Sequence, residues 1–458
     1  MLVKIPLYSI YMKAKNWGFD VRELESTIRP QDDFFHYVNK RWMDKNPIPA
    51  TESRWGSFNI LRYDSEKKLQ AILHELDATR NLSAGSPEKI IRDFYRSGMD
   101  MKRRNELGLL PLKELRTKLE KISSVKDLLT VVTALHRIGV GVLWGAGIDQ
   151  DAKNSEQYLL HFYQDGIGMP DRDYYLNDDE ESVRVRTAYR THVEGLFRIM
   201  GCVSKQAKEN TETILRVETM LARVMMKKED SRDTEKTYHK KTIAALARET
   251  KNIDWERYLK LSSAKEVKEV VVMQPDFLKA VNDMLPQVPL EDWKTYLDFH
   301  TVNDFSGVLS DKLVKHSFTF YGTVLSGTKV MKPLWRRVLG VVNGHVGELL
   351  GRIYVKKHFT AEAKTRMNIL VDDLFTAYEA RLKSLDWMTP ATKKKALVKL
   401  RALNRKIGYP DKWKNFTGLE ISATDYVGNI IRTNEFEHVR TMKKLRGPID
   451  RGEWFMYP

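Results

Sequence analysis

Apolar residues recur at helical spacing along most of the chain, and the clearest case lies in the segment DWMTPATKKKALVKLRALNRKIGYPDKW. Its apolar stripe has intervals of four, three and four residues, typical of one helix face, and comprises Ala396, Leu400, Leu403 and Ile407. Thr389 can cap this helix, and Pro390 fits the first turn because its missing N–H costs nothing there. Gly408 favours the left-handed conformation that ends helices, so the pattern predicts a helix between Pro390 and Gly408.

The segment before it repeats this pattern, so the two together predict an αα-hairpin. The apolar positions of the earlier stripe are Leu370, Leu374, Tyr378, Leu382 and Leu385. Elsewhere, Ser263 followed by Glu266 has the spacing of a capping box and predicts the start of a short helix. These patterns favour a mainly α fold.

Two stretches have the β-branched and aromatic composition of strands instead. Residues 139–150 (GVGVLWGAGIDQ) and 157–164 (QYLLHFYQ) flank a polar turn at 151–155, which predicts a β-hairpin. The run VVVM at Val270–Met273 is too short for a helix and is ended by Pro275, so it predicts a short strand. The glycines of the first arm lack the G-x-G-x-x-G spacing of a phosphate-binding loop.

With 458 residues, of which 42% are hydrophobic and 30% charged, the chain has the composition of a globular protein with room for two or three domains. No apolar run is long enough to predict a membrane span, and the N-terminus lacks the continuous apolar region and cleavage site of a signal peptide. Cys202 is the only cysteine. This favours a reducing compartment and cytoplasmic localisation, with export of a disulfide-free protein as the alternative.

The formal net charge of +16 raises the question of nucleic-acid binding. The basic residues are scattered, however, and acidic residues accompany them, as in LARETKNIDWERYLK. The densest basic cluster, Lys393–Lys395, lies within the amphipathic helix described above and is explained by its solvated face. Because no basic-aromatic motif occurs, no nucleic-acid partner is predicted.

None of the common catalytic motifs is complete. In many zinc hydrolases two histidines at i and i+4 hold the ion, and a glutamate beside the first activates the bound water. His74 and Glu75 begin such a motif, but Ala78 occupies the place of the second histidine. His345 and Glu348 begin the inverted motif H-x-x-E-H, but Leu349 occupies the place of its second histidine. Glu435 and His438 have the i, i+3 spacing used in di-iron bundles, but no second pair accompanies them. Gly-x-Ser-x-Gly is absent as well, so these motifs predict no catalytic residue and no metal ligand.

Longer segments are more informative. The first is DDFFHYVNKRWMDKNPIPATESRWGSFNILR at Asp32–Arg62, and those that follow are GIGMPDRDYY, LWRRVLGVVNGHVGELLGRIYVKKHF, LDWMTPATKKKALVKL, IGYPDKW and PIDRGEWFMYP. In this order they resemble the N-terminal region of neprilysin-like zinc metallopeptidases, the M13 family that includes endothelin-converting enzymes and bacterial oligopeptidases. The resemblance runs from about residue 30 to the end of the chain. The cysteine-free HYVNKRW is similar to bacterial members, although its N-K-R-W departs from the commoner N-G-x-W.

The resemblance implies a mainly α fold, in which a large helical lid domain with a small β-hairpin accompanies part of a thermolysin-like catalytic domain. Four regions are implied: a leader at 1–31, a substrate-wall segment of the catalytic domain at 32–64, the helical lid at 65–340, and helical connecting segments at 341–458. In the family, the stretch matching Pro448–Pro458 precedes a substrate-binding strand, the H-E-x-x-H helix and a glutamate ligand. The zinc-binding half of the catalytic domain is therefore expected to be absent from this chain.

By the same resemblance, four residues contact bound peptides. Arg54 matches an arginine that meets the C-terminal side of the peptide, a role that suits a guanidinium because it can bind a carboxylate bidentately. Phe58 matches a wall of the primed-side specificity pocket, and Arg62 matches a second basic residue in the next subsite. Asn59 stands where some members have an aspartate. The alternative for both arginines is an exposed position without a binding role.

The leading hypothesis is the N-terminal region of a zinc endopeptidase that acts on small peptides and is inactive as this chain alone. Zinc is then the cofactor of the full-length enzyme, with none expected here, and the partners are peptide substrates and the missing C-terminal half. The apolar stripes from Gly351 onward, with Trp454, Phe455 and Met456, are expected to face that half. Two alternatives stay open: a non-enzymatic helical peptide-binding protein, and a basic helical protein that binds polyanions through its charge.

Overall fold

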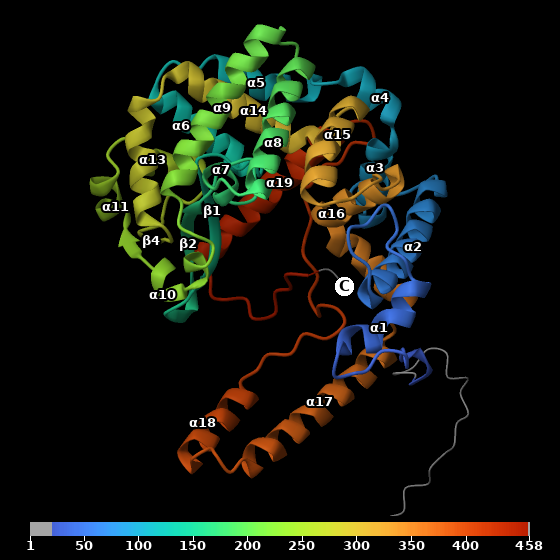
Figure 1. Ribbon diagram of the computed structural model, residues 1–458. Helices are drawn as coiled ribbons and strands as arrows, with labels where there is room; N and C mark the ends of the chain where they lie inside the picture. Colours follow the sequence, from blue (N-terminus) through green and yellow to red (C-terminus); the bar gives the residue numbers. More distant parts are fainter. Residues whose placement is uncertain (1–20, 457–458) are drawn as a thin grey trace, which may run out of the picture.

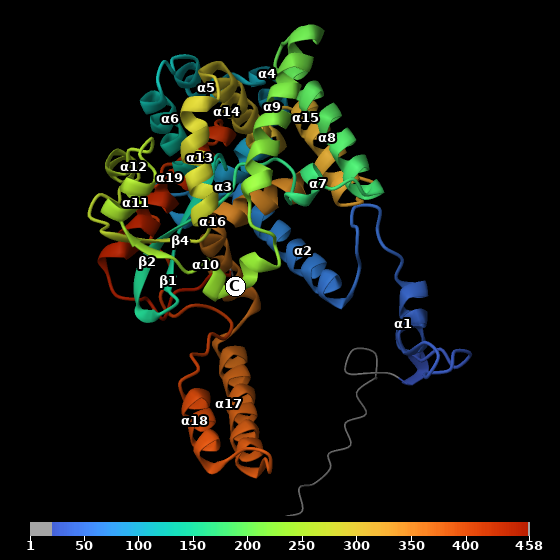
Figure 2. The ribbon, with the colours of Figure 1, turned by 60° about the vertical axis from the view of Figure 1, so that its left-hand side comes forward.

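Helices arranged around one small sheet form the body of the molecule, as Figures 1 and 2 show. The computed structural model describes residues 21–456, so residues 1–20 of the predicted leader (1–31), and residues 457 and 458, lie outside the described residues. No helix among the described residues is both long enough and apolar enough to cross a membrane. The predicted mainly α fold with a small β element is confirmed.

The helices are spread over the whole described chain. The α-helices in the first half of the chain are α1 (Phe34–Lys45), α2 (Ser57–Ala78), α3 (Pro87–Met99), α4 (Met101–Leu107), α5 (Lys113–Glu120), α6 (Val125–Arg137), α7 (Asp173–Leu176), α8 (Glu180–Ile199) and α9 (Ser204–Val224). The remaining α-helices are α10 (Thr234–Thr237), α11 (Ile243–Glu249), α12 (Trp255–Leu261), α13 (Pro275–Gln287), α14 (Leu290–Phe305), α15 (Asp311–Ser317), α16 (Leu334–His358), α17 (Ala361–Ser384), α18 (Pro390–Arg401) and α19 (Tyr426–Met442). A π-helix, η5 (Phe318–Leu325), continues α15.

The sheet has the strand order β1-β2-β4-β3. Its strands are β1 (Trp144–Asp151), β2 (Asn154–Gln164), β3 (Lys240–Thr242) and β4 (Glu269–Val272). The predicted hairpin is the antiparallel β1–β2 pair, and the predicted short strand is β4, which lies parallel to β2 with Leu160 opposite Val270. The three valines of β4 are buried, and a short strand buried on both faces has a continuous apolar run instead of alternating apolar and polar residues.

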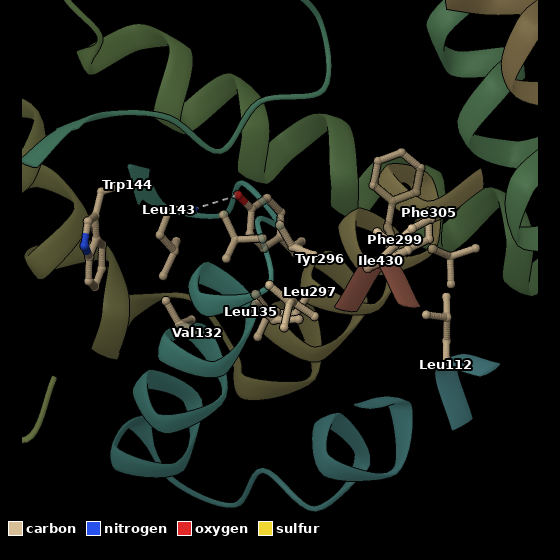
Figure 3. Close-up of a cluster of buried hydrophobic side chains, with 14 of the residues drawn as sticks. Leu112, Val132, Leu135, Leu143, Trp144, Tyr296, Leu297, Phe299, Phe305 and Ile430 are labelled. Carbon is tan, nitrogen blue, oxygen red and sulfur yellow. Dashed lines mark hydrogen bonds between the residues drawn. The ribbon is translucent and has the colours of Figure 1, made fainter. Parts of the chain in front are cut away.

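The main core lies between the helices and the start of β1 (Figure 3). The Tyr296 hydroxyl accepts a hydrogen bond from the Leu143 amide at 3.1 Å and donates one to the Gly166 carbonyl at 2.7 Å. Gly166 has a φ of +93°, and a Cβ there would lie 2.5 Å from the Leu143 nitrogen and 2.6 Å from the Tyr296 hydroxyl. Glycine is therefore required at this close approach of two loops.

A buried carboxylate holds the GIGMPDRDYY segment in place. Glu218 of α9 is fully buried. It accepts hydrogen bonds from the Gly168 amide at 3.1 Å and from the hydroxyls of Tyr175 and Tyr189, each at 2.9 Å. These three donors replace the water that the carboxylate loses on burial, and they tie the loop before α7 to helices α8 and α9.

Helices α17 and α18 form the predicted αα-hairpin, which projects from the body in both ribbon views (Figures 1 and 2). Thr389 caps α18 through the Thr392 amide at 3.2 Å, and Pro390 is the first helical residue, as the sequence predicts. Neither helix contains a buried residue. The apolar stripe of α17 remains exposed at Leu370, Leu374 and Tyr378.

The prediction that the second helix continues to Gly408 is wrong, because α18 ends at Arg401. The residues after it leave the helix and bind the C-terminal tail: the Asn404 amide donates to the Arg451 carbonyl at 2.6 Å, and Lys406 donates to the Glu453 carbonyl. Gly408 does have a φ of +76°, but a Cβ there would lie 2.5 Å from the Phe359 ring. Its role is therefore close packing, and it caps no helix.

The capping box predicted at Ser263 is also absent, since no helix begins there. Ser263 instead follows the end of α12 with a φ of +61° and leads into the approach to β4. Its amide donates to the Lys260 carbonyl at 3.3 Å, as in a terminal helical turn.

Two of the predicted domain boundaries fall inside helices. The boundary between residues 64 and 65 lies within α2, and the one between residues 340 and 341 lies within α16. Helix α19, from the predicted connecting region 341–458, packs into the main core through Tyr426, Val427 and Ile430. The chain thus returns to the helical body after the α17–α18 hairpin.

The C-terminal tail is bound to the body through its polar residues. Glu453 is nearly buried, and its carboxylate lies 2.6 Å from the Lys444 ammonium and 3.5 Å from the Arg440 guanidinium. The Asp450 amide donates to the Tyr158 hydroxyl of β2 at 3.2 Å. Of the apolar residues after Glu453, Phe455 and Met456 are exposed, at 82% and 76%, and Trp454 is half-buried. The tail is therefore anchored at one side and apolar at the other.

Candidate functional site

A cavity of about 710 Å³ lies where the segment before and at the start of α2 meets the loop between η5 and α16. The first wall consists of Thr51, Glu52, Ser53, Arg54, Phe58, Asn59 and Arg62. The second wall consists of Phe318, Thr328, Met331, Lys332 and Arg337. The cavity thus combines two parts of the chain that are far apart in sequence.

Backbone hydrogen bonds join the two walls. The amides of Lys329 and Val330 both donate to the Ala50 carbonyl, at 3.1 and 2.9 Å. The Thr328 amide donates to the Gly322 carbonyl of the π-helix at 2.9 Å, which ties the second wall to η5. Because these bonds involve only the main chain, they fix the spacing of the walls whatever the side chains do.

Glu52 forms the electrostatic centre of this junction. Its carboxylate lies 3.0 Å from Arg62, 3.2 Å from Lys332 and 3.3 Å from Arg336, and it accepts a hydrogen bond from the Tyr63 hydroxyl at 3.1 Å. Burial alone would raise the pKa of Glu52, but Lys332, Tyr63 and Arg62 together hold it below its ordinary value. The carboxylate is therefore ionised at neutral pH and largely neutralised by its neighbours.

Aromatic packing fixes the first turn of α2 behind the cavity. The Tyr63 ring meets the Trp55 ring edge-on with centroids 4.9 Å apart, and the Arg336 guanidinium lies 3.6 Å from the Tyr63 centroid. Arg336 also pairs with Glu66 one turn further along α2. Cation–π and ionic contacts of this kind hold the helix start against α16.

All four residues predicted to contact peptides line this one cavity, but they differ in availability. Arg54 is exposed and forms no hydrogen bond or ion pair with the described residues, and the Phe58 side chain is 88% exposed. Asn59 lies in the first turn of α2, where its backbone N–H donates to the Gly56 carbonyl at 2.9 Å. Arg62 is committed to Glu52, so it is less free to bind a ligand than Arg54.

The second wall is absent from the predicted site. Arg337 lies in the LWRRVLG segment that carries part of the family resemblance, and Lys332 lies two residues before that segment. Glu52 lies two residues before Arg54. Their residue types and positions were visible in the sequence. Their proximity to Arg54 was not, because it depends on the packing of α16 against α2.

The described residues do not fit a zinc ion. They contain no group of three or more histidine, cysteine, aspartate and glutamate side chains able to hold a metal. The Nδ1 atom of His345 lies 2.8 Å from the Val341 carbonyl, and the Nε2 atom of His438 lies 3.0 Å from the Ser262 carbonyl. Both histidines are thus engaged by the main chain.

Cys202 shows no sign of activation. The thiol is half-buried at the edge of a smaller cavity, and burial followed by the charge of Asp298 raises its pKa. A raised pKa keeps the sulfur protonated, whereas a catalytic cysteine needs its thiolate.

Comparisons with known proteins agree with the resemblance of the segments. The family model described as Peptidase family M13 matches residues 30–410. Endothelin-converting enzyme-like 1 from Rattus norvegicus is 27% identical over a stretch that covers 95% of this chain and 58% of the relative. Endothelin-converting enzyme 1 from Homo sapiens is 28% identical, with coverages of 95% and 58%. The chain therefore spans somewhat less than three fifths of the length of these relatives.

Solved structures give the same assignment. The zinc metalloprotease ZMP1 from Mycobacterium tuberculosis, in complex with an inhibitor, has a TM-score of 0.89 and 33% identity, covering 96% of this chain and 66% of that one. PepO from Lactobacillus rhamnosis has a TM-score of 0.81 at 21% identity, covering 94% and 68%, and shows the fold alone. Because the family model matches well over half of the sequence, this chain belongs to peptidase family M13.

Proposed function

We propose that this chain supplies the helical lid and one wall of the peptide-binding site of a zinc metalloendopeptidase that acts on small peptides. The observation that carries the proposal is Arg54, an exposed arginine without an ionic partner among the described residues, beside the exposed Phe58 ring in a cavity of about 710 Å³. An unpaired arginine beside an exposed aromatic ring suits a peptide end, which offers a carboxylate and a side chain.

Each wall residue has a role that follows from its surroundings. Arg54 binds the C-terminal carboxylate of the peptide, because nothing else competes for its guanidinium. Phe58 packs against an apolar side chain of the peptide, and the side-chain amide of Asn59 hydrogen-bonds the peptide backbone. Arg62 contributes charge to the wall while its pairing with Glu52 keeps it in place.

We propose that the zinc-dependent step is carried out by residues other than the described ones. Peptide hydrolysis of this type needs three metal ligands and a general base, and the described residues offer no such group. We therefore propose that this chain alone neither holds zinc tightly nor cleaves peptides, and that it functions together with a zinc-binding half. Peptide binding and peptide cleavage are then separable properties.

The test is to measure both properties on the purified chain. Equilibrium dialysis against zinc is expected to show no tightly held ion, and chromatography of incubated peptides is expected to show no cleavage. Calorimetry is expected to detect binding of Ac-Ala-Phe-Ala-Gln-Ala as the free acid, and weaker binding of its amide. Arg54→Ala should remove that difference, since a charge-assisted hydrogen bond contributes about 1.5–3 kcal/mol.

Arg366→Ala is the matched control, because Arg366 is an exposed arginine of α17 far along the chain from the cavity. Cleavage that a chelator abolishes would overturn the proposal that the zinc step needs another segment. Failure to bind either peptide would overturn the peptide-binding role. Binding by the chain together with a finding that no zinc-binding half exists would support the non-enzymatic alternative.

A further inference from the structure

The second wall of the cavity contains an arginine, Arg337, whose terminal groups have no ligand in the described residues. Arg337 lies in the first turn of α16 and is half-buried. Its Nε atom donates to the Lys332 carbonyl at 3.1 Å, which directs the side chain along the loop, and it forms no ion pair with the described residues. Asp311, an acid that acts on it electrostatically, is paired with Lys315 at 2.5 Å.

The other cations around the cavity already have carboxylate partners. Arg62, Lys332 and Arg336 share the Glu52 carboxylate, and Arg336 also pairs with Glu66. Four cationic side chains line the cavity against the single carboxylate of Glu52. Because that carboxylate is occupied, the cavity keeps an excess of positive charge, and its unpaired part comes from Arg54 on one wall and Arg337 on the other.

Apolar side chains lie beside both arginines. Phe58 belongs to the first wall, and Phe318 and Met331 belong to the second. A ligand that satisfies this lining needs an apolar group together with two separate anionic groups, one for each wall. A peptide with a C-terminal carboxylate supplies only one anion, so the second must come from a side chain.

We propose that Arg337 is a specificity-determining residue that selects peptides carrying an aspartate or glutamate side chain together with a large apolar residue. This inference rests on the proposed function, and it assigns the two anions to different arginines. Arg54 takes the C-terminal carboxylate and Arg337 takes the acidic side chain. A guanidinium suits the task because it is always charged and presents several donors in one plane.

The experiment uses calorimetry on the full chain with four peptides. The parent is Ac-Ala-Phe-Ala-Gln-Ala, and the second peptide replaces Gln with Glu; each is made as the free acid and as the amide. The unmodified chain is expected to bind the Glu amide about tenfold more tightly than the Gln amide. The preference should weaken as the salt concentration rises, because it is electrostatic.

Two variants separate the arginines. Arg337→Gln is expected to abolish the Glu-over-Gln preference and to leave the acid-over-amide preference intact. Arg54→Gln is expected to do the reverse. Arg337→Lys keeps the charge and should retain part of the Glu preference, and Arg366→Gln removes an arginine elsewhere and should change neither ratio. Circular dichroism melts establish that each variant is folded.

The outcomes distinguish a failure of the role of Arg337 from a failure of the proposed peptide-binding function. If no peptide binds, the proposed peptide-binding function fails. If the peptides bind but the unmodified chain does not prefer Glu, the role of Arg337 is overturned whatever the variants show. The role is equally overturned if Arg337→Gln removes the acid-over-amide preference, because Arg337 would then bind the terminal carboxylate.

Discussion

The Nη1 atom of Arg336 lies 3.3 Å from the Oε1 atom of Glu52, and both side chains are nearly buried, at 5% and 9% exposure. This contact joins α16 to the segment that carries Arg54. It explains why the two walls of the cavity form one unit, although more than half of the described chain lies between them. Removing either partner leaves the other nearly buried with one counter-charge fewer, which is costlier than losing a surface pair.

The first prediction concerns this junction. Glu52→Gln is expected to destabilise the protein by about 3 kcal/mol, because Arg336 and Lys332 lose a buried carboxylate. The urea midpoint of unfolding measures the effect. Glu114→Gln is the control: Glu114 is exposed and paired only with Lys118 one turn away, so its loss is expected to cost less than about 1 kcal/mol. Equal midpoints for the two variants would show that the junction is not an energetic centre.

A second prediction concerns pH and the turn between β1 and β2. Asp151 is 2% exposed and accepts hydrogen bonds from the Lys153 amide at 2.9 Å and from Gln157 and Tyr238, each at 2.8 Å. Burial alone would raise the pKa of Asp151, but these bonds and the charge of Lys240 lower it from 3.8 to about 2. The folded pKa lies below the unfolded one. The stabilisation is therefore complete above the unfolded pKa and is lost as the pH falls toward the folded value.

Asp151→Asn is accordingly expected to lose about 2 kcal/mol at neutral pH. Its urea midpoint should also change less than that of the unmodified chain between about pH 5 and pH 3. Asp64→Asn is the matched control, since Asp64 is exposed and has only a 4.0 Å contact with Lys67. Parallel pH profiles for Asp151→Asn and the unmodified chain would contradict the assignment.

The third prediction tests the buried Glu218. Tyr189→Phe removes one of its three donors without changing the shape of the ring, so about 1–3 kcal/mol of stability should be lost. Tyr378→Phe, on the exposed face of α17, should change stability by less than about 0.5 kcal/mol. Thermal melts of both variants provide the comparison. A neutral Tyr189→Phe would mean that another group replaces the lost hydroxyl, and His300 is placed to do so because its Nε2 atom lies 2.9 Å from the Glu218 carboxylate.

The sequence predicted those elements whose start or type depends on neighbouring residues. Thr389 and Pro390 placed the start of α18, and the aromatic and β-branched run placed β1 and β2. The end of α18 was missed because it depends on a distant partner: Asn404 and Lys406 bind the tail instead of continuing the helix. A periodic apolar pattern cannot reveal that competition, since Leu403 has helical spacing whether or not the helix reaches it.

The candidate site divides in the same way. Arg54 and Phe58 were found through one contiguous segment that resembles the family. The pairing of Arg62 with Glu52, ten residues before it, depends on the turn into α2. The place of Arg337 in the cavity wall depends on the packing of α16 on α2, so neither could be predicted from the sequence. Charge type alone could not separate Arg54, which is free, from Arg62, which is engaged. That distinction belongs to tertiary structure.

The last prediction concerns the projecting hairpin. Helix α14 has a series of fully buried side chains in the main core, among them Trp293, Tyr296 and Phe299, whereas α17 and α18 have no buried residue at all. Amides open most easily where few apolar contacts hold the backbone. Hydrogen exchange followed by mass spectrometry is therefore expected to be slow in α14 and fast in α17 and α18. The anchored residues around Glu453 should exchange at an intermediate rate, since Lys444 and Arg440 hold that side chain.

The exposed stripe of α17 also makes this result sensitive to concentration. Contiguous apolar surface favours association, at roughly 25 cal/mol for each Å² removed from water. Leu374→Glu should leave the exchange of α14 unchanged, because Leu374 contacts no part of the main core. If instead α17 is fast at low concentration but slow at high concentration, and Leu374→Glu keeps it fast at both, the stripe is covered by another copy of the chain. A hairpin that is slow at every concentration and unaffected by Leu374→Glu would show that its two helices are stable by themselves, without any covering partner.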